Sequence, residues 1–338
     1  MNASIRFRRR ITRALPHLLR RIAEPARAIT PLTLLASPLL ANHGPGTTGG
    51  GSSTISGETL KKGGFDLTLR SDFTQYEEFT RAEAAEHAIE SGEFDAIDRT
   101  FVETLSLSYG VTDDFQVAAS IGWYEGTNFV DAEEDGGGGA EVTDADPAGL
   151  TDLWLQGKFR LSHGPSGHFA LIGGVKLPTG KDDETLSNGE ELEPSSQPGS
   201  GAVDFQAGVA WSRYLTSRVT IDASGLYTLR GEHDDFRVGD RVDVGTALAY
   251  RLTEDVKSFP NWSVSGEMLG TWLDEDEDDG VANENSGGTT VYLAAGIRER
   301  IDEHVALTLA PALPVYQDEN GDQAETSAKL VFSLSFSL

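Results

Sequence analysis

The 338-residue sequence contains no cysteine, which excludes disulfides, thiolate metal sites, cysteine nucleophiles and a lipid anchor on an N-terminal cysteine. It also has no run of about 18 consecutive apolar residues, the length that a membrane-spanning helix needs. Basic residues are few, because 27 Lys and Arg stand against 54 Asp and Glu, giving a net charge of −27. Nucleic-acid affinity comes from cations that neutralise phosphates. We therefore expect no nucleic-acid partner.

The N-terminus combines positive charge with a short apolar run. Eight arginines and a single acid, Glu24, fall within residues 1–41, and the segment ends in ITPLTLLASPLLA. A positive region, an apolar core and a small final residue are typical of a secretory signal peptide. We predict a signal peptide over residues 1–41 and a flexible periplasmic leader over the Gly/Ser/Thr-rich residues 42–63. A disordered basic tail is the alternative for the first segment.

The remaining residues, 64–338, alternate apolar and polar side chains with a period of two, which indicates half-buried strands. In the hairpin from Gly149 to Gly180, for example, Leu155 and Phe159 fall on one face, and Gln156 and Lys158 on the other. We predict twelve strands, near 64–76, 100–110, 115–125, 150–161, 168–178, 202–214, 219–230, 241–252, 262–273, 289–300, 305–316 and 328–338. Pro311 and Pro314 indicate that the eleventh strand breaks early or carries a bulge.

The connections between these strands alternate between mostly long and short. Short turns such as VTDD, SHGPSG and LTSR follow the even strands, and longer loops follow the odd ones. Residues 81–91, RAEAAEHAIES, are expected to add a short helix to the first loop. Long loops outside and short turns in the periplasm are typical of outer-membrane barrels.

Large aromatic side chains share the apolar face and lie near the strand ends. They are Tyr109, Trp123, Trp211, Tyr227, Tyr250, Trp262 and Trp272. Two aromatic belts that bound an apolar band match the two water interfaces of a bilayer. We therefore predict an all-β fold, a transmembrane antiparallel up-and-down β-barrel of about 12 strands in the bacterial outer membrane.

Several segments resemble a known family. GLTDLWLQGKFRL, GGVKLPTGK, GAVDFQAGVAWSRYL and LYTLR are similar to segments of the outer-membrane barrel family named for the MetA pathway of phenol degradation. The most specific piece is VKLPTG, residues 175–180. Two departures are Thr151, where a second Gly is usual, and Leu338, where an aromatic residue is common. The resemblance implies an outer-membrane transporter.

Candidate site residues lie on the polar face, which we expect to line the lumen. Tyr124, Trp154, Tyr292 and Tyr316 all fall toward the long-loop ends of their strands, where they could stack an aromatic solute. Lys158, Lys176 and Arg298 lie deeper and would favour an anionic or phenolic group. Ordinary packing beneath the loops is the alternative for the aromatic residues, and a lumen plugged by Arg–Asp ladders and the leader is the alternative for the path.

The loops at 131–146 and 274–280 are dense in carboxylates, which could bind Ca²⁺ or Mg²⁺ weakly, although a solvated acidic face is the simpler explanation. We assign no metal site and no other cofactor. No histidine lies within a strand beside a candidate serine, so we expect no enzymatic activity.

We predict an outer-membrane channel for the passive passage of small solutes, including aromatic or hydrophobic organic compounds. The alternative is a structural or surface-interaction barrel with a closed lumen and cation-binding acidic loops. The expected partners are outer-membrane lipid, a small-molecule solute and the barrel-insertion machinery. The sequence does not indicate an oligomeric state.

Overall fold

The computed structural model describes residues 51–338, so the predicted signal peptide and residues 42–50 of the predicted leader lie outside the described residues. Twelve long antiparallel strands form one sheet that closes on itself, because β2 pairs with both β1 and β3. The strands are β1 (Phe65–Tyr76), β2 (Glu93–Gly110), β3 (Phe115–Glu134), β6 (Leu153–Ser162), β7 (His168–Leu177), β8 (Asp204–Tyr214), β9 (Val219–Leu229), β12 (Arg241–Arg251), β13 (Asn261–Leu273), β16 (Gly288–Arg300), β17 (Val305–Glu319) and β18 (Thr326–Ser337). All twelve predicted strands are therefore confirmed.

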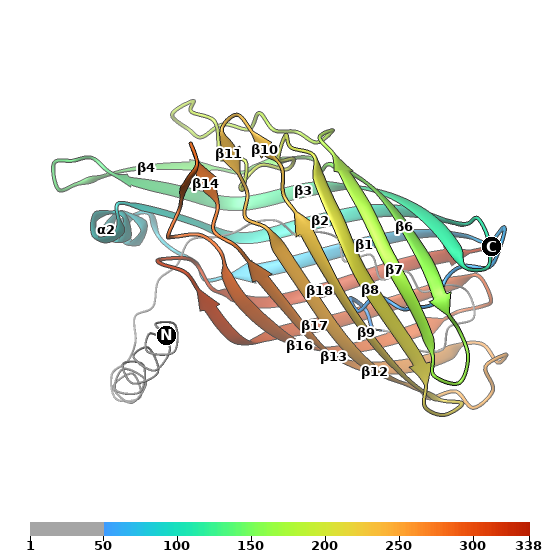
Figure 1. Ribbon diagram of the computed structural model, residues 1–338. Helices are drawn as coiled ribbons and strands as arrows, with labels where there is room; N and C mark the ends of the chain where they lie inside the picture. The colour runs from blue at the N-terminus through green and yellow to red at the C-terminus, as the bar shows by residue number, and fades with distance from the viewer. Residues whose placement is uncertain (1–50) are drawn as a thin grey trace, which may run out of the picture.

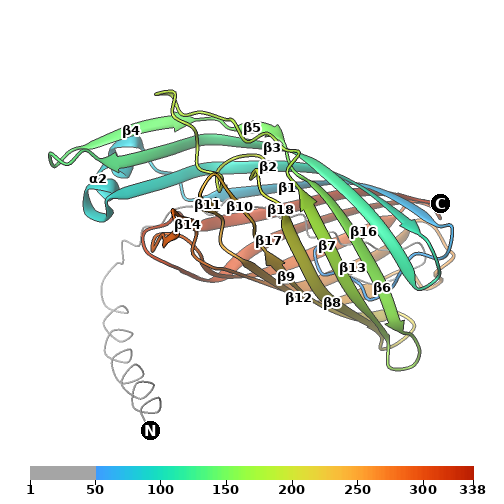
Figure 2. The ribbon, with the colours of Figure 1, turned by 45° about the horizontal axis from the view of Figure 1, so that its top comes forward.

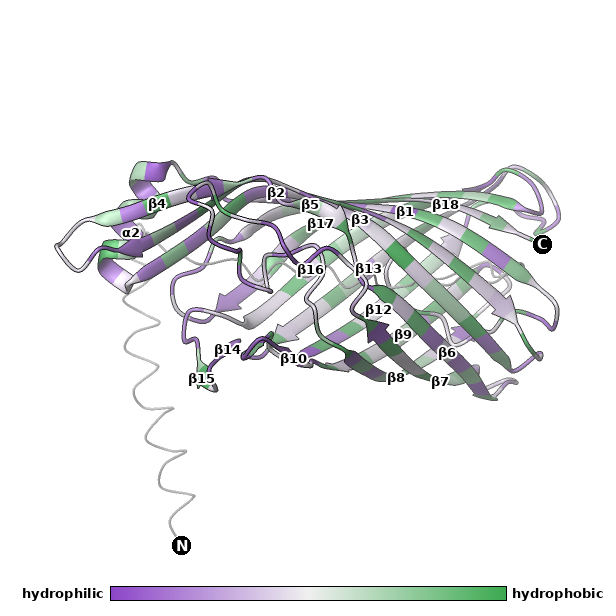
Figure 3. Cartoon of the chain, turned by 90° about the horizontal axis from the view of Figure 1, so that it is seen from above, coloured by the Kyte–Doolittle hydropathy of each residue, from purple (hydrophilic) through white to green (hydrophobic). Residues whose placement is uncertain are grey.

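The barrel is apolar on its outer face and polar on its inner face. In β12, Asp243 is 3% exposed, whereas Leu248 is 53% exposed. A soluble barrel would bury the leucine and expose the aspartate. Figure 3 shows the same alternation along the strands, where hydrophobic residues recur at every second position. The outer surface therefore fits an apolar surrounding such as lipid.

The two ends of the barrel differ, as Figures 1 and 2 show. One end has short turns, and the other carries long loops with further elements. These are α2 (Arg81–Ser91), β4 (Ala140–Ala145), β5 (Ala148–Leu150), and the small sheet of β10 (Glu232–His233), β11 (Phe236–Arg237), β14 (Glu277–Asp278) and β15 (Val281–Ala282). The predicted helix at 81–91 is confirmed. Within residues 51–338, no helix combines the length and the apolar character that crossing a membrane requires.

Strands β2 and β3 continue beyond the predicted strand limits, over residues that we expected to form loops. They pair from Glu93 with Glu133 down to Gly110 with Gln116, and β4 pairs with the far end of β3. We call residues 93–99 and 126–134 the hairpin extension. Its apolar face is covered by α2, so Phe94 and Ala132 are fully buried. The alternation between apolar and polar residues is interrupted at Ile97 and Asp98, between the extension and the rest of β2, which is why the sequence did not reveal the extension.

Strand β17 also runs further than predicted. It passes through both prolines to Glu319, so the predicted early break is wrong. The register with β16 shifts between Val291 and Tyr292, where Tyr292 faces Pro314 and Val291 faces Tyr316. Val315 is therefore the extra residue of a β-bulge, the other outcome that the prolines indicated.

Candidate functional site: a lumen occupied by the leader

Residues 51–60 of the leader lie inside the barrel instead of in the periplasm. Residues 51–57 and 59–60 are almost completely buried. The carboxylate of Glu267 anchors residues 52–54. Glu267 on β13 accepts hydrogen bonds from the Ser52 backbone amide, from the Ser52 hydroxyl at 2.7 Å, and from the Thr54 amide at 3.0 Å and hydroxyl at 3.1 Å. The Ser53 amide is the fifth donor, at 3.1 Å. The prediction of a flexible periplasmic leader is wrong for these residues.

Further contacts hold the leader along its course to the short-turn end. Arg70 on β1 donates to the Ser52 carbonyl at 2.6 Å, and Lys158 on β6 donates to the Ser56 carbonyl at 3.1 Å. The Ser56 hydroxyl lies 3.0 Å from the Ser212 hydroxyl on β8. Near the rim, the Leu60 amide donates to Gln116 Oε1 at 2.9 Å. The leader is therefore bound to strands on several sides of the lumen.

Two glycines allow the backbones to approach closely. A Cβ atom on Gly57 would lie 2.3 Å from the carbonyl oxygen of His168, and one on Gly110 would lie 2.0 Å from that of Lys61. Because real Cβ contacts are never this short, a side chain at either position would push the leader away from the wall. The fit between leader and wall is thus steric as well as polar.

Most wall charges are already paired. Lys176 lies 2.8 Å from Asp204 and 3.2 Å from Asp152, and Arg230 lies 3.0 Å from Asp204. Arg241 and Asp243 form a similar pair at 2.6 Å. Lys158 and Lys176, which we predicted to favour an anion, are therefore engaged by the leader and by aspartates respectively. Arg298, the third predicted cation, donates to the Thr308 hydroxyl at 3.1 Å.

Three of the predicted aromatic residues face inward. Tyr124 on β3 and Trp154 on β6 are 6% and 7% exposed, and Tyr292 on β16 is also buried. Tyr124 packs in a cluster with residues of the hairpin extension and with Leu192 of the 178–203 loop. Its hydroxyl has no hydrogen-bond partner within residues 51–338. Tyr292 donates to the Thr326 hydroxyl, and the ammonium of Lys329 lies 4.3 Å from the centre of its ring.

Tyr316, the fourth predicted aromatic residue, points outward. It is 52% exposed, and its hydroxyl donates to Asp318 at 2.9 Å. The cause is the bulge at Val315, because one extra residue reverses which side chains face the lumen beyond it. Sequence reasoning also missed Lys329 as the partner of Tyr292, a pairing that only the register of the sheet brings about.

The sequence was compared with known proteins. The model of the family named for the MetA pathway of phenol degradation matches residues 98–309. No curated protein sequence matches the chain significantly. Among solved structures, the COG4313 outer membrane channel from Pseudomonas putida F1 is similar, with a TM-score of 0.57, 12% identity, and coverage of 83% of this chain and 97% of that one.

Two further structures are less similar. The TodX deltaS2S3 mutant monoaromatic hydrocarbon channel has a TM-score of 0.46 and 12% identity, with 92% of this chain and 97% of that chain covered. The NanC porin has a TM-score of 0.45 and 10% identity, with 80% of this chain and 100% of that chain covered.

The family match extends over more than half of the chain, and the fold agrees with it. The closed barrel and its apolar outer face place the protein in the bacterial outer membrane. The chain belongs to the outer-membrane β-barrel family named for the MetA pathway of phenol degradation.

Proposed function

We propose that the protein is an outer-membrane channel for small solutes and that the buried part of the leader, residues 51–60, is its gate. The observation that carries this proposal is how the leader is held. It lies inside the closed barrel and is bound by hydrogen bonds to Glu267, Arg70, Lys158 and Ser212, but it pairs as a strand with none of the wall strands. Such contacts can be exchanged for water without breaking the barrel.

The lining also supports passage once the leader is displaced. Twelve strands enclose more space than the eight whose interior side chains just fill a barrel. The charged residues of the wall are largely paired with one another, so the wall keeps its structure without the leader. Fixed charges along a water-filled path determine which solutes pass.

For the solute class, we propose neutral aromatic compounds of phenol-like size. Tyr124 and Trp154 offer aromatic faces on neighbouring strands near the outer end, and the unpartnered Tyr124 hydroxyl could exchange a hydrogen bond with a phenol. The family's name points to the same compounds. Lys176 is paired with wall aspartates and Lys158 with the leader, so in the closed state neither lysine is available to an anion.

A reversible cross-link tests the gate. Because the chain has no cysteine, the double substitution Ser56→Cys and Ser212→Cys places one pair of thiols where two hydroxyl oxygens lie 3.0 Å apart. We expect conductance steps from the wild-type protein in planar bilayers. Oxidation of the double variant should abolish them, and a reductant should restore them.

The single variants Ser56→Cys and Ser212→Cys control for the substitutions and for the oxidant, and mass spectrometry measures the extent of cross-linking. Unchanged conductance in fully cross-linked protein would show that the leader is not the gate. If neither the wild type nor the variant shows conductance steps under oxidising or reducing conditions, the result would instead favour a structural barrel with a closed lumen.

A further inference from the structure

The hairpin extension separates an apolar face from an acidic one. Along β2, Phe94 and Ala96 alternate with Glu93 and Asp95, so the two pairs point to opposite faces. The ring of Phe94 lies 5.0 Å from that of Phe79 and 4.8 Å from that of His87 on α2. Since α2 covers this face, Glu93 and Asp95 occupy the other face, two residues apart on one strand.

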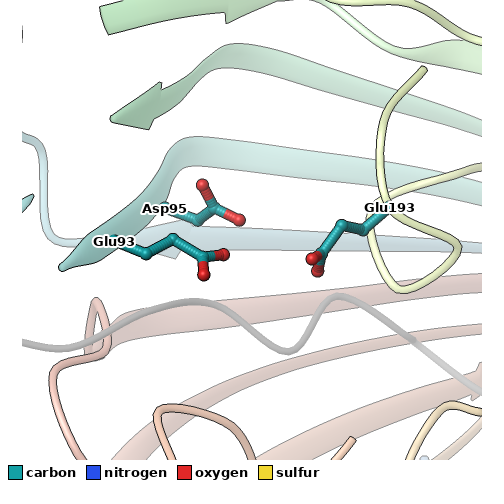
Figure 4. A group of neighbouring side chains, drawn as sticks. All are labelled: Glu93, Asp95 and Glu193. Atoms are coloured by element: carbon teal, nitrogen blue, oxygen red, sulfur yellow. The ribbon is translucent and has the colours of Figure 1, made fainter. Parts of the chain in front are cut away.

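A third carboxylate reaches the acidic face from a distant part of the sequence. Glu193 belongs to the 178–203 loop between β7 and β8, and Figure 4 shows its side chain directed toward those of Glu93 and Asp95. One oxygen from each of the three carboxylates lies within 4.8 Å of the others. The loop is positioned by other contacts, because Leu192 is buried in the apolar cluster and Gln197 donates to the Leu192 carbonyl at 2.9 Å.

Among residues 51–338, no Lys or Arg forms an ion pair with Asp95. Asp95 is only 9% exposed, and its Oδ1 atom has no hydrogen-bond partner in the described part of the chain. The charged groups that act on Asp95 are Asp131, Glu193, Glu93 and Glu133, all of them carboxylates. A buried, unpartnered carboxylate oxygen is costly unless something compensates it.

We propose that Glu93, Asp95 and Glu193 bind a calcium ion at the outer mouth of the barrel. Ca²⁺ takes oxygen ligands at about 2.3–2.6 Å, so oxygens on opposite sides of the ion lie about 5 Å apart. One oxygen from each carboxylate lies within 4.8 Å of the other two, so a single ion can contact all three. Ca²⁺ accepts several carboxylate ligands in a flexible geometry, whereas Mg²⁺ gives up its waters reluctantly and usually keeps several of them. The three ligands lie outside the acidic segments 131–146 and 274–280 in which we expected weak cation binding.

The ion joins the hairpin extension to the 178–203 loop. It replaces repulsion between Glu193 and the strand carboxylates by attraction to a shared cation, and its remaining ligand positions are filled by water. The site fixes this loop above the lumen, and its existence does not depend on whether the barrel conducts.

Calorimetric titration of the detergent-solubilised, full barrel with CaCl₂ tests the site. We expect one saturable Ca²⁺ per chain, with a Kd on the order of 0.1–1 mM as in other extracellular sites, and weaker binding of MgCl₂. Glu193→Gln should weaken Ca²⁺ binding by at least about tenfold, because it removes a ligand from the loop. Asp95→Asn should have the same effect from the strand side.

Glu191→Gln is the matched control, since it removes the same charge from an exposed position two residues away in the same loop. Heat-modifiable gel migration verifies that each variant forms the barrel. The proposal is overturned if the wild type shows no saturable binding or binds Mg²⁺ as tightly as Ca²⁺. It is also overturned if Glu191→Gln and Glu193→Gln weaken binding equally, because the effect would then be one of overall charge.

Discussion

At the scale of single residues, Glu267 is a central anchor of the leader inside the lumen. Its carboxylate accepts five hydrogen bonds from Ser52, Ser53 and Thr54, and Arg70 adds two more to Ser52 and Ser53. Hydrogen bonds to a charged group contribute about 1.5–3 kcal/mol each, roughly twice the value for a neutral acceptor. The strength of the leader's attachment therefore depends on the charge of this one residue.

Replacing Glu267 by Gln should loosen the leader while leaving the barrel folded. A loss of about 2 kcal/mol corresponds to a roughly 30-fold increase in the displaced population. The expected result is a higher open probability in planar bilayers. Glu254→Gln is the control, since Glu254 is exposed in the short turn between β12 and β13 and, among residues 51–338, forms an ion pair with Arg218 alone. Equal open probabilities for both variants would contradict the anchoring role of Glu267.

Residue-level prediction from the sequence was accurate wherever a strand kept its period. Tyr124, Trp154 and Tyr292 face inward as the alternation indicates, and Trp123 and Tyr227 face outward. The exception, Tyr316, follows a bulge whose position depends on how two prolines are accommodated opposite β16. A period of two cannot reveal a single inserted residue, because the residues beyond it alternate as regularly as before.

At the scale of elements, the hairpin extension depends on α2. The helix begins with a capping box in which the Thr80 hydroxyl accepts from the Glu83 amide, and the Thr80 amide donates to the Glu83 side chain at 3.0 Å. Its buried residues, Ala84 and Ala88, lie in the cluster that contains Phe94. The helix therefore shields an apolar surface that would otherwise be exposed to water.

Thr80→Ala should destabilise this helix without affecting the barrel. Loss of an N-cap hydroxyl costs about 1 kcal/mol, which corresponds to roughly fivefold faster amide exchange within α2. Hydrogen–deuterium exchange with peptide resolution measures this change, and Thr80→Ser should retain wild-type protection. Equal protection of α2 in all three proteins would show that the cap does not limit its stability.

Elements differed in how well the sequence predicted them. Regular strands and the helix at 81–91 were predicted because their pattern is local. The leader was not, because GSSTISGETL has no period and is ordered only by partners such as Glu267 and Ser212, more than 150 residues away. The proximity of Glu93 and Glu193 was not predicted either, because only the fold brings these two residues together.

At the scale of the whole molecule, charge is distributed unevenly between the two ends. The segments 131–146 and 274–280 place many carboxylates at the outer end, next to the cluster of Glu93, Asp95 and Glu193. A mouth lined by one sign of charge concentrates counter-ions and repels ions of like charge. This field acts before a solute reaches the paired charges of the wall.

The open channel should therefore prefer cations to anions and neutral solutes to acids. In a tenfold KCl gradient, we expect a reversal potential of the sign for K⁺ selectivity, which diminishes as the ionic strength of both compartments rises. In liposomes, phenol should enter faster than benzoate of similar size. Chloride selectivity, or equal uptake of the two aromatics, would contradict this expectation.

The leader is also covalently continuous with β1, so it can rebind inside the lumen soon after it is displaced. Residues 61–64 join the leader to the wall, so a displaced leader stays within reach of its own binding groups. A short tether of this kind gives an effective concentration in the range of about 1 mM or more. Reclosure is then independent of protein concentration, and a free peptide with the sequence GSSTISGETL would have to reach millimolar levels to compete.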